Sequence, residues 1–318
     1  MTKIVSFTRV LNEDDIIEAF VRHHAGHVDE MLFLDNGSTD RTLEILKALR
    51  EEGFLLKVFS NHAVSFDEIA INSWGYRAAS QLLGADWVAF LDADEFIATP
   101  DSAPLLTLLP ETLPAVSAKL VNYGQVGGED VDEPVIPWRL RWRYAGEINV
   151  RKVMAKAGIP GLVVGLGNQG VFAGGKELPA PPLEGVSLAH YPRRDGWQLM
   201  QKWAAGRLKA LASGAPGEFY SGHYTGPYER LRDRPWEFML NAEFLAKDFD
   251  KSVAMEAPLA YLGGPLAYYQ PSDPRMKALS GFLNMTEQLA RQHGRLLDES
   301  PEARALVEAW NAKRDFLF

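Results

Sequence analysis

Short apolar runs and amphipathic stretches alternate along the first hundred residues. Four short apolar runs predict strands, and they lie at 4–7, 31–34, 55–59 and 87–91, the last of them a buried central strand. Between them, apolar residues recur at helical spacing over roughly 13–25, 40–52 and 66–83. Asn12 is expected to cap the first of these helices. This order of strands and helices predicts an α/β fold with a doubly wound, mostly parallel sheet.

The pattern is less regular after residue 94. Further strand candidates lie at 116–122, 150–156, 162–166 and 186–190, with a short helix at 105–109. The Gly-rich, acidic segment 123–137 predicts a long exposed loop, and 138–144 predicts a half-exposed strand whose three arginines face water or, as the alternative, bind an acidic acceptor. From Asp195 onward, helical spacing dominates. We therefore expect an α/β domain over 1–205 and a mostly helical C-terminal subdomain over 206–318.

Composition limits the classes of function. The chain has 318 residues and a formal net charge of −9, which argues against general affinity for nucleic acid. It contains no cysteine, which excludes disulfides, thiol catalysis and zinc–thiolate sites. We find neither a signal-peptide pattern nor an apolar window of the ~18 residues that a membrane span needs. A cytoplasmic protein is expected, and peripheral contact with a membrane is left open.

Three carboxylates follow the apolar run that ends at Leu91, namely Asp92, Asp94 and Glu95. In α/β sheets, ligands bind at the carboxyl ends of the strands. Acidic side chains crowded at such an end repel each other unless a cation or several hydrogen-bond donors compensate. An Asp-x-Asp motif there is suited to Mg²⁺ or Mn²⁺, which keep coordination positions open for phosphate oxygens.

A second polar segment, Asp35-Asn36-Gly37-Ser38-Thr39-Asp40, lies at an equivalent strand end. A loop that enters a helix N-terminus offers free N–H groups and a carboxylate, which suit the ribose or base of a nucleoside. Together the two segments predict a nucleoside diphosphate that lies across the strand ends with its phosphates on the metal. Turn and cap formation is the structural alternative for Asp35.

Three segments resemble the N-terminal motifs of family 2-type glycosyltransferases with the GT-A fold. They are Thr8-Arg9-Val10-Leu11-Asn12-Glu13, Leu34 to Asp40, and Phe90-Leu91-Asp92-Ala93-Asp94-Glu95-Phe96. The chain is most similar to the bacterial branch in which Glu-Phe follows Asp-x-Asp. That branch has a later Gly-Asn-His, where this chain has Gly167-Asn168-Gln169, and a His-Tyr that matches His190-Tyr191. The resemblance covers roughly residues 3–205.

The resemblance implies a metal-dependent, inverting glycosyltransferase that moves a sugar from a nucleoside diphosphate sugar to a hydroxyl of a carbohydrate or glycan acceptor. Residues 1–205 would then be a GT-A-like domain that binds the nucleotide sugar and carries the catalytic site. Asp35 would contact the base or ribose, and Arg9 and Glu13 would line the nucleoside pocket. The whole set expected to bind the nucleotide sugar is Thr8, Arg9, Glu13, Asp35, Asn36, Asp40, Asp92 and Lys152.

The resemblance also implies a divalent cation, Mn²⁺ or Mg²⁺, held by Asp92, Asp94 and His190. It would neutralise the charge that builds on the departing diphosphate. Inversion needs a carboxylate base that takes the proton of the acceptor hydroxyl. Glu129, Asp130 and Glu147 follow the central strand and are the candidates for this base. The sequence does not choose among them.

Two alternatives remain open. A haloacid-dehalogenase-like phosphohydrolase also places Asp-x-Asp after an apolar strand, with the first Asp as nucleophile, but normally on its first strand. A sugar-nucleotide-binding protein without turnover would carry the same binding motifs. The donor sugar, the acceptor, the oligomeric state and the role of the C-terminal third do not follow from the sequence.

A histidine cluster has a structural interpretation. His23, His24 and His27 lie one to four residues apart near the end of the first predicted helix. We expect a solvated helix end there and not a metal site.

Overall fold

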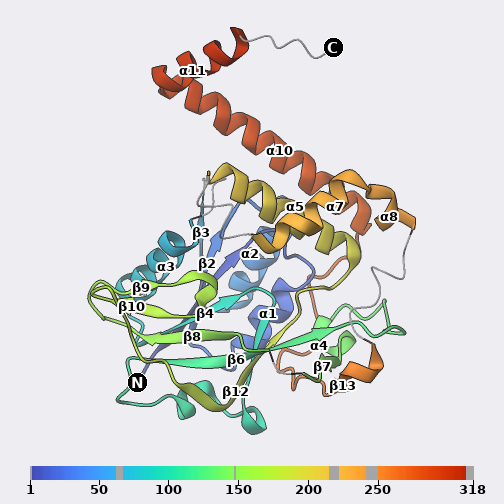
Figure 1. Cartoon of the computed structure of the whole chain (residues 1–318). Coiled ribbons are helices and arrows are strands. Elements are labelled where there is room, and N and C mark those ends of the chain that lie inside the picture. The colour runs from blue at the N-terminus through green and yellow to red at the C-terminus, as the bar shows by residue number, and fades with distance from the viewer. Residues whose placement is uncertain (1, 62–66, 147, 215–221, 241–249, 313–318) are drawn as a thin grey trace.

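The computed structural model describes residues 2–61, 67–146, 148–214, 222–240 and 250–312. Its centre is a mixed sheet, and most of the helices lie on its faces or across one of its edges (Figure 1). The main path through this sheet has the strand order β13-β7-β6-β8-β4-β1-β2-β3. No helix among the described residues is long and apolar enough to cross a membrane.

The first half of the chain forms the parallel part of the sheet. Its strands are β1 (Ile4–Val10), β2 (Glu30–Asp35), β3 (Leu56–Ser60) and β4 (Trp87–Asp92). The connecting helices are α1 (Ile17–His24), α2 (Thr42–Glu52) and α3 (Glu68–Leu82). β1 pairs in parallel with both β2 and β4, and β2 with β3. The predicted α/β class and the predicted order of these elements are confirmed.

Alternate residues of the central strands point to two separate hydrophobic cores. Phe33 and Leu91 pack with residues of α1 and α2 on one face. Phe7 and Phe90 pack with residues of α3 on the other face. β1, β2 and β4 are buried on both faces, which is why they appear in the sequence as continuous apolar runs, whereas the edge strand β3 is exposed beyond Leu56.

The second half of the sheet is mostly antiparallel. Its strands are β5 (Glu95–Ala98), β6 (Ala115–Gly124), β7 (Trp142–Tyr144), β8 (Arg151–Lys156), β12 (Pro182–His190) and β13 (Ala254–Glu256). β8 runs antiparallel to β4 and β6, whereas β12 is parallel to β6 and antiparallel to β5. The pairing of His190 with Glu95 brings the end of β12 to the acidic end of β4.

Smaller elements complete this part of the chain. A separate three-stranded sheet contains β9 (Val163–Val164), β10 (Val171–Ala173) and β11 (Lys176–Glu177). Single turns form η1 (Pro100–Ser102), η2 (Leu105–Leu108), η3 (Leu166–Asn168) and the helix α4 (Ile136–Arg139).

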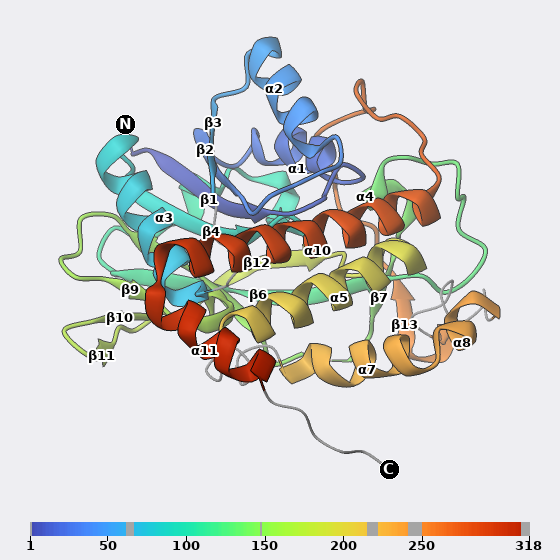
Figure 2. The same cartoon turned by 90° about the horizontal axis from the view of Figure 1, so that it is seen from above.

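The C-terminal third is mostly helical. It contains α5 (Gly196–Ala212), η4 (Gly222–Tyr224), α7 (Thr225–Asp233), α8 (Pro235–Leu240), η5 (Lys251–Val253), α10 (Pro274–Glu299) and α11 (Pro301–Ala312). α10 packs along α5, and both run across the molecule in Figure 2. Residues 205 and 206 both lie within α5, and a division of the chain between them stays a prediction.

The expectation of a strand over 138–144 is wrong for its first half. Pro137 lies in the first turn of α4, where its missing N–H costs no hydrogen bond. Ile136 and Leu140 lie four residues apart and are both buried, so one helical turn hides both side chains. Arg139 points back and donates to the carbonyl oxygen of Arg194 at 3.1 Å, while Arg141 is exposed.

The solvated helix end expected at His23, His24 and His27 is also wrong, because all three side chains are buried. His23 Nε2 lies 2.7 Å from the carbonyl oxygen of Ile97, and its Nδ1 accepts from the backbone N–H of Leu262. Backbone from two distant segments therefore covers this end of α1. Burial lowers the pKa of His23 to about 4 and that of His27 to about 4.

Candidate active site

The carboxyl ends of β1 and β4 bring Arg9 beside Asp92. Arg9 Nη2 lies 2.8 Å from Asp92 Oδ1, and Lys152 Nζ from β8 lies 2.7 Å from Asp92 Oδ2. Lys152 also pairs with Glu95 at 2.9 Å, and Arg9 with Glu68 at 2.9 Å. Burial opposes ionisation of Asp92, yet Lys152 and Arg9 hold its pKa well below the usual range. Three of the predicted nucleotide-sugar residues thus meet at one point.

Asp94 is buried and faces a different set of basic groups. Its Oδ2 lies 2.6 Å from Lys202 Nζ, 3.6 Å from His190 Nε2 and 3.8 Å from Arg194 Nη1. Burial alone would raise the pKa of Asp94, but Lys202, His190 and Arg194 hold it well below the usual range. Much of the positive charge that the acidic strand end requires comes from the protein itself.

Arg194 ties the loop after β1 to this strand end. Its Nη2 lies 2.5 Å from Glu13 Oε2, and its Nε lies 2.7 Å from Asp15 Oδ2. Burial raises the pKa of Glu13 to about 7, because Arg194 offsets the desolvation only in part and Asp94 adds repulsion. Sequence reasoning missed Arg194 and Lys202, because both lie about a hundred residues after the acidic motif and no local pattern links them to it.

Hydrogen bonds between residues close in sequence fix the conformation of the loop after β2. Asp35 accepts from the backbone N–H groups of Gly37 and Ser38 at 3.1 and 3.0 Å, and Asp40 accepts from Thr42 N–H at 2.9 Å. The expectation that Asn12 caps α1 is wrong, because α1 begins after Ile16. Asn12 adopts a φ of 57° and accepts from the N–H of Thr39 at 2.8 Å, so it joins the two strand-end loops.

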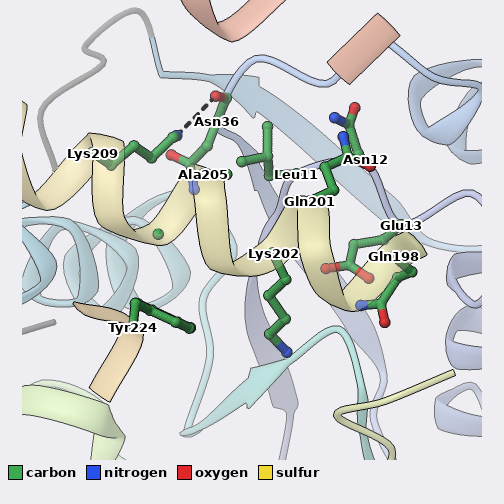
Figure 3. A pocket seen from close by; sticks show the side chains of 11 residues that line it. Leu11, Asn12, Glu13, Asn36, Gln198, Gln201, Lys202, Ala205, Lys209 and Tyr224 are labelled. Atoms are coloured by element: carbon green, nitrogen blue, oxygen red, sulfur yellow. Dashed lines mark hydrogen bonds between the residues drawn. The ribbon is translucent and has the colours of Figure 1, made fainter. Parts of the chain in front are cut away.

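A pocket with about 770 Å³ of empty space, part of it open to solvent, lies between these loops and α5 (Figure 3). Its wall is formed by Leu11, Asn12, Glu13, Asn36, Gln198, Gln201, Lys202, Ala205, Gly206, Lys209 and Tyr224. Lys209 Nζ donates to the carbonyl oxygen of Asn36 at 3.2 Å, and burial lowers the pKa of Lys209 to about 8. Thr8 is fully buried beneath the loops, outside this wall.

The three base candidates occupy different environments. Glu129 accepts from the backbone N–H of Val126 at 2.6 Å and lines a second pocket together with Asp15 and Arg194. Asp130 is exposed and accepts from the N–H of Asp132. Glu147 lies outside the described residues.

The predicted metal trio is only partly assembled. Among the described residues, no group of three His, Asp or Glu side chains converges as a metal-binding set. Asp92 faces Arg9 and Lys152, whereas Asp94 and His190 face each other. In proteins, Mg²⁺ is usually bound through one or two protein ligands, with phosphate oxygens and water completing its shell, so a pair of ligands is sufficient.

The pair Asp94 and His190 fits a divalent cation. His190 Nδ1 lies 2.7 Å from the side-chain oxygen of Asn122, and this contact orients the ring so that Nε2 faces Asp94, where a neutral imidazole would offer its lone pair to a cation. The ion pairs described above join six carboxylates to four cations, so carboxylates outnumber cations in this cluster, although burial raises the pKa of Glu13 to about 7. The carboxylates are Glu13, Asp15, Glu68, Asp92, Asp94 and Glu95, and the cations are Arg9, Lys152, Arg194 and Lys202.

Residues 8–158 match the family model described as glycosyl transferase family 2. No curated protein matches the chain. Similar solved structures include glucosyl-3-phosphoglycerate synthase from Mycobacterium tuberculosis in complex with Mg²⁺ and uridine diphosphate. It is 23% identical over 38% of this chain and 44% of its own length, with a TM-score of 0.27, so the chain spans less than half of it. A mannosyltransferase from Pyrobaculum calidifontis in complex with GDP-Man and Mn²⁺ is 13% identical over 96% of this chain and 82% of its own, with a TM-score of 0.39.

Proposed function

We propose, from the match of residues 8–158 to glycosyl transferase family 2, that the protein transfers a sugar from a nucleoside diphosphate sugar to an acceptor hydroxyl. The observation that supports this most directly is the position of the pocket beneath α5. Its wall joins the loops after β1 and β2 to Lys202, whose ammonium reaches Asp94 at the end of β4. A nucleoside near Asn36 would therefore have its diphosphate near Asp94.

Asp94 and His190 would hold the divalent cation, Mn²⁺ or Mg²⁺. When bound there, such an ion stabilises the negative charge that develops on the departing diphosphate. Arg9 and Lys152 keep Asp92 ionised, so that its carboxylate accepts hydrogen bonds from the ribose or from ordered water. Asp35 and Asp40 hold the shape of the loop that receives the nucleoside.

The acceptor hydroxyl would enter through the second pocket, opposite the nucleoside. Glu129 lines it beside Arg194, which in turn lies 3.8 Å from Asp94. We place the base of an inverting transfer at Glu129 ahead of Asp130, because the Asp130 carboxylate is exposed on the loop. A half-buried carboxylate near the reacting atoms takes the proton as the hydroxyl attacks the anomeric carbon.

Thermal shift with a panel of nucleoside diphosphates, with and without Mn²⁺, tests this function. We expect at least one nucleoside diphosphate to raise the melting temperature in the presence of Mn²⁺, and Asp94→Asn to weaken the effect at least tenfold in ligand concentration. Arg141→Gln, on an exposed ion pair away from the pocket, serves as the matched control. Release of nucleoside diphosphate from a panel of sugar nucleotides then identifies the donor.

Three results would count against the proposal. If no nucleoside diphosphate raises the melting temperature, the proposed function loses its support. Stabilisation without release from any sugar nucleotide and acceptor would favour a binding protein without turnover. Release of inorganic phosphate from phosphomonoesters, abolished by Asp92→Asn, would favour the phosphohydrolase.

A further inference from the structure

Lys202 lies at the junction of the nucleotide pocket and the acidic strand end. Its side chain comes from α5, lines the pocket and points out of it toward the strands in Figure 3. Its ammonium lies 2.6 Å from Asp94 Oδ2, the same oxygen that His190 Nε2 faces at 3.6 Å. The protein thus places a cation of its own where the two proposed metal ligands meet.

We propose that Lys202 is a tethered cation that holds Asp94 until a divalent metal ion takes that carboxylate, and that its ammonium then moves to the donor diphosphate. This inference rests on the proposed function and deepens it, because it assigns the residue that links metal binding to nucleotide binding. It concerns Lys202 itself and no other group of the site.

Electrostatics favours the exchange. An ammonium at hydrogen-bond distance from Asp94 Oδ2 and a divalent ion on the same carboxylate would repel each other at short range in a site with little water to screen them. Asp94 is 3% exposed, so bulk solvent does not offset that repulsion. Each cation therefore binds the carboxylate more weakly while the other occupies it.

Lys202 is the cation that is able to leave. Arg194 has no exposed side-chain surface and pairs with Glu13, Asp15 and Asp94, so moving it would break three ion pairs. The Lys202 side chain is 30% exposed, and Asp94 is the single carboxylate within 4 Å of its ammonium among the described residues. Lysine also has four rotatable side-chain bonds and loses little when it changes partner.

The pocket supplies the second position for the ammonium. Because Lys202 lines the same cavity as Asn36 and Glu13, a swing of its side chain would bring the ammonium into that cavity, where the proposed function places the diphosphate. The helix itself need not move, since Asp195 caps its first turn through the N–H groups of Trp197 and Gln198. Metal and nucleoside diphosphate should therefore bind cooperatively. The metal ion frees the ammonium of Lys202 for the diphosphate, and the diphosphate draws that ammonium away from the carboxylate that the metal ion needs.

Mn²⁺ binding in the absence of nucleotide tests the inference, with free Mn²⁺ measured by electron paramagnetic resonance. We expect Lys202→Met to bind Mn²⁺ roughly tenfold more tightly than the wild type, because the competing ammonium is gone. In the presence of Mn²⁺, the same variant should bind UDP or GDP, whichever stabilises the wild type, roughly tenfold more weakly. Lys202→Gln, which can still donate a hydrogen bond to Asp94, should shift both affinities in the same directions.

Lys209→Met is the matched control. Lys209 lies on the same helix and lines the same pocket, but its ammonium contacts the carbonyl oxygen of Asn36 and not Asp94. Its Mn²⁺ affinity without nucleotide should equal that of the wild type. Circular dichroism of each variant, compared with the wild type, establishes that the fold is retained.

The outcomes separate the two proposals. If both Lys202 variants bind Mn²⁺ no more tightly than the wild type, while the wild type still binds a nucleoside diphosphate, the tether is wrong and the proposed function stands. If the wild type binds neither Mn²⁺ nor any nucleoside diphosphate, the proposed function fails and the tether with it.

Discussion

Single side chains set the charge balance at the end of β4, and Arg194 is the one among its four cations whose side chain has no exposed surface. A fully buried guanidinium is tolerated only when carboxylates surround it, and Glu13, Asp15 and Asp94 do so here. The pKa of Arg194 is raised by these partners even though burial opposes its charge. One residue thereby connects the β1 loop, the end of β4 and the start of α5.

Arg194→Met should lower the free energy of unfolding by about 3 kcal/mol or more, because it leaves buried carboxylates without their partner. Urea denaturation followed by circular dichroism measures the change. Arg141→Met is the control, since Arg141 pairs with Glu256 at the surface and its loss should cost less than about 1 kcal/mol. Equal effects of the two substitutions would contradict the structural role of Arg194.

Glu129→Gln should reduce kcat by about 100-fold or more if Glu129 is the base, with the KM for the nucleotide sugar nearly unchanged. Steady-state kinetics with the donor identified from the panel gives both constants. Asp130→Asn, one residue along the same loop but exposed, should retain most of the activity. A fully active Glu129→Gln enzyme would leave the base to be found elsewhere, with Glu147 as the next candidate to substitute.

Helices approach the sheet at distances that small residues permit. Gly75 of α3 lies against Phe7 of β1, and a Cβ atom at Gly75 would come within 2.4 Å of the phenyl ring. Phe7 is buried in the core beneath α3 and has little room to yield. α5 approaches α10 in a similar way, because a Cβ atom at Gly281 would overlap the side chain of Gln201.

Gly75→Ala should destabilise the protein by about 1–3 kcal/mol, because the gain in helix propensity is smaller than the strain of overpacking. Gly294 offers the opposite case in α10: it is helical, and no atom lies within 4 Å of an added Cβ. Gly294→Ala should therefore stabilise by about 0.5–1 kcal/mol. Chemical denaturation of both variants checks the signs, and two shifts of the same sign would refute this account of α3 packing.

At the scale of the whole molecule, segments far apart in the chain enclose groups that prefer water. β5 and the segment around Leu262 close over the end of α1, so His23 and His27 are held neutral in the interior. Their pKa values fall to about 4, below the ordinary value of a histidine. Between about pH 6.5 and about pH 4 the unfolded chain therefore binds more protons than the folded one, and stability decreases as the pH falls through that window.

The free energy of unfolding should fall by about 2 kcal/mol for each such histidine between about pH 7.5 and about pH 5. His27→Phe should remove one of these contributions. His27 suits the test because its buried Nδ1 has no hydrogen-bond partner among the described residues, so the substitution sacrifices little. Urea denaturation of the variant and the wild type at both pH values provides the comparison, and equal pH dependence would contradict a neutral, buried His27.

The sequence alone determined the parallel half of the fold and the acidic end of its central strand. Strands buried on both faces need continuous apolar runs, and the helices between them need apolar residues at helical spacing. Both patterns can therefore be recognised in a short stretch of sequence. The Asp-x-Asp motif directly follows one such run, which is why Asp92 and Asp94 were recognised. The segment 138–144 has a weaker local signal. Its alternation of cationic and large side chains predicted a strand, but the helical turn that includes Pro137 extends to Arg139.

The groups that face those carboxylates are set by long-range packing. A helical pattern tells which side of α5 is apolar, but not which strand end the helix crosses. The contacts of Arg194 and Lys202 with Asp94 join residues about a hundred positions apart. The burial of His23 likewise depends on β5 and on backbone near residue 262. Such contacts follow from the packing of whole elements, because local periodicity encodes the face that an element buries and not the partner that covers it.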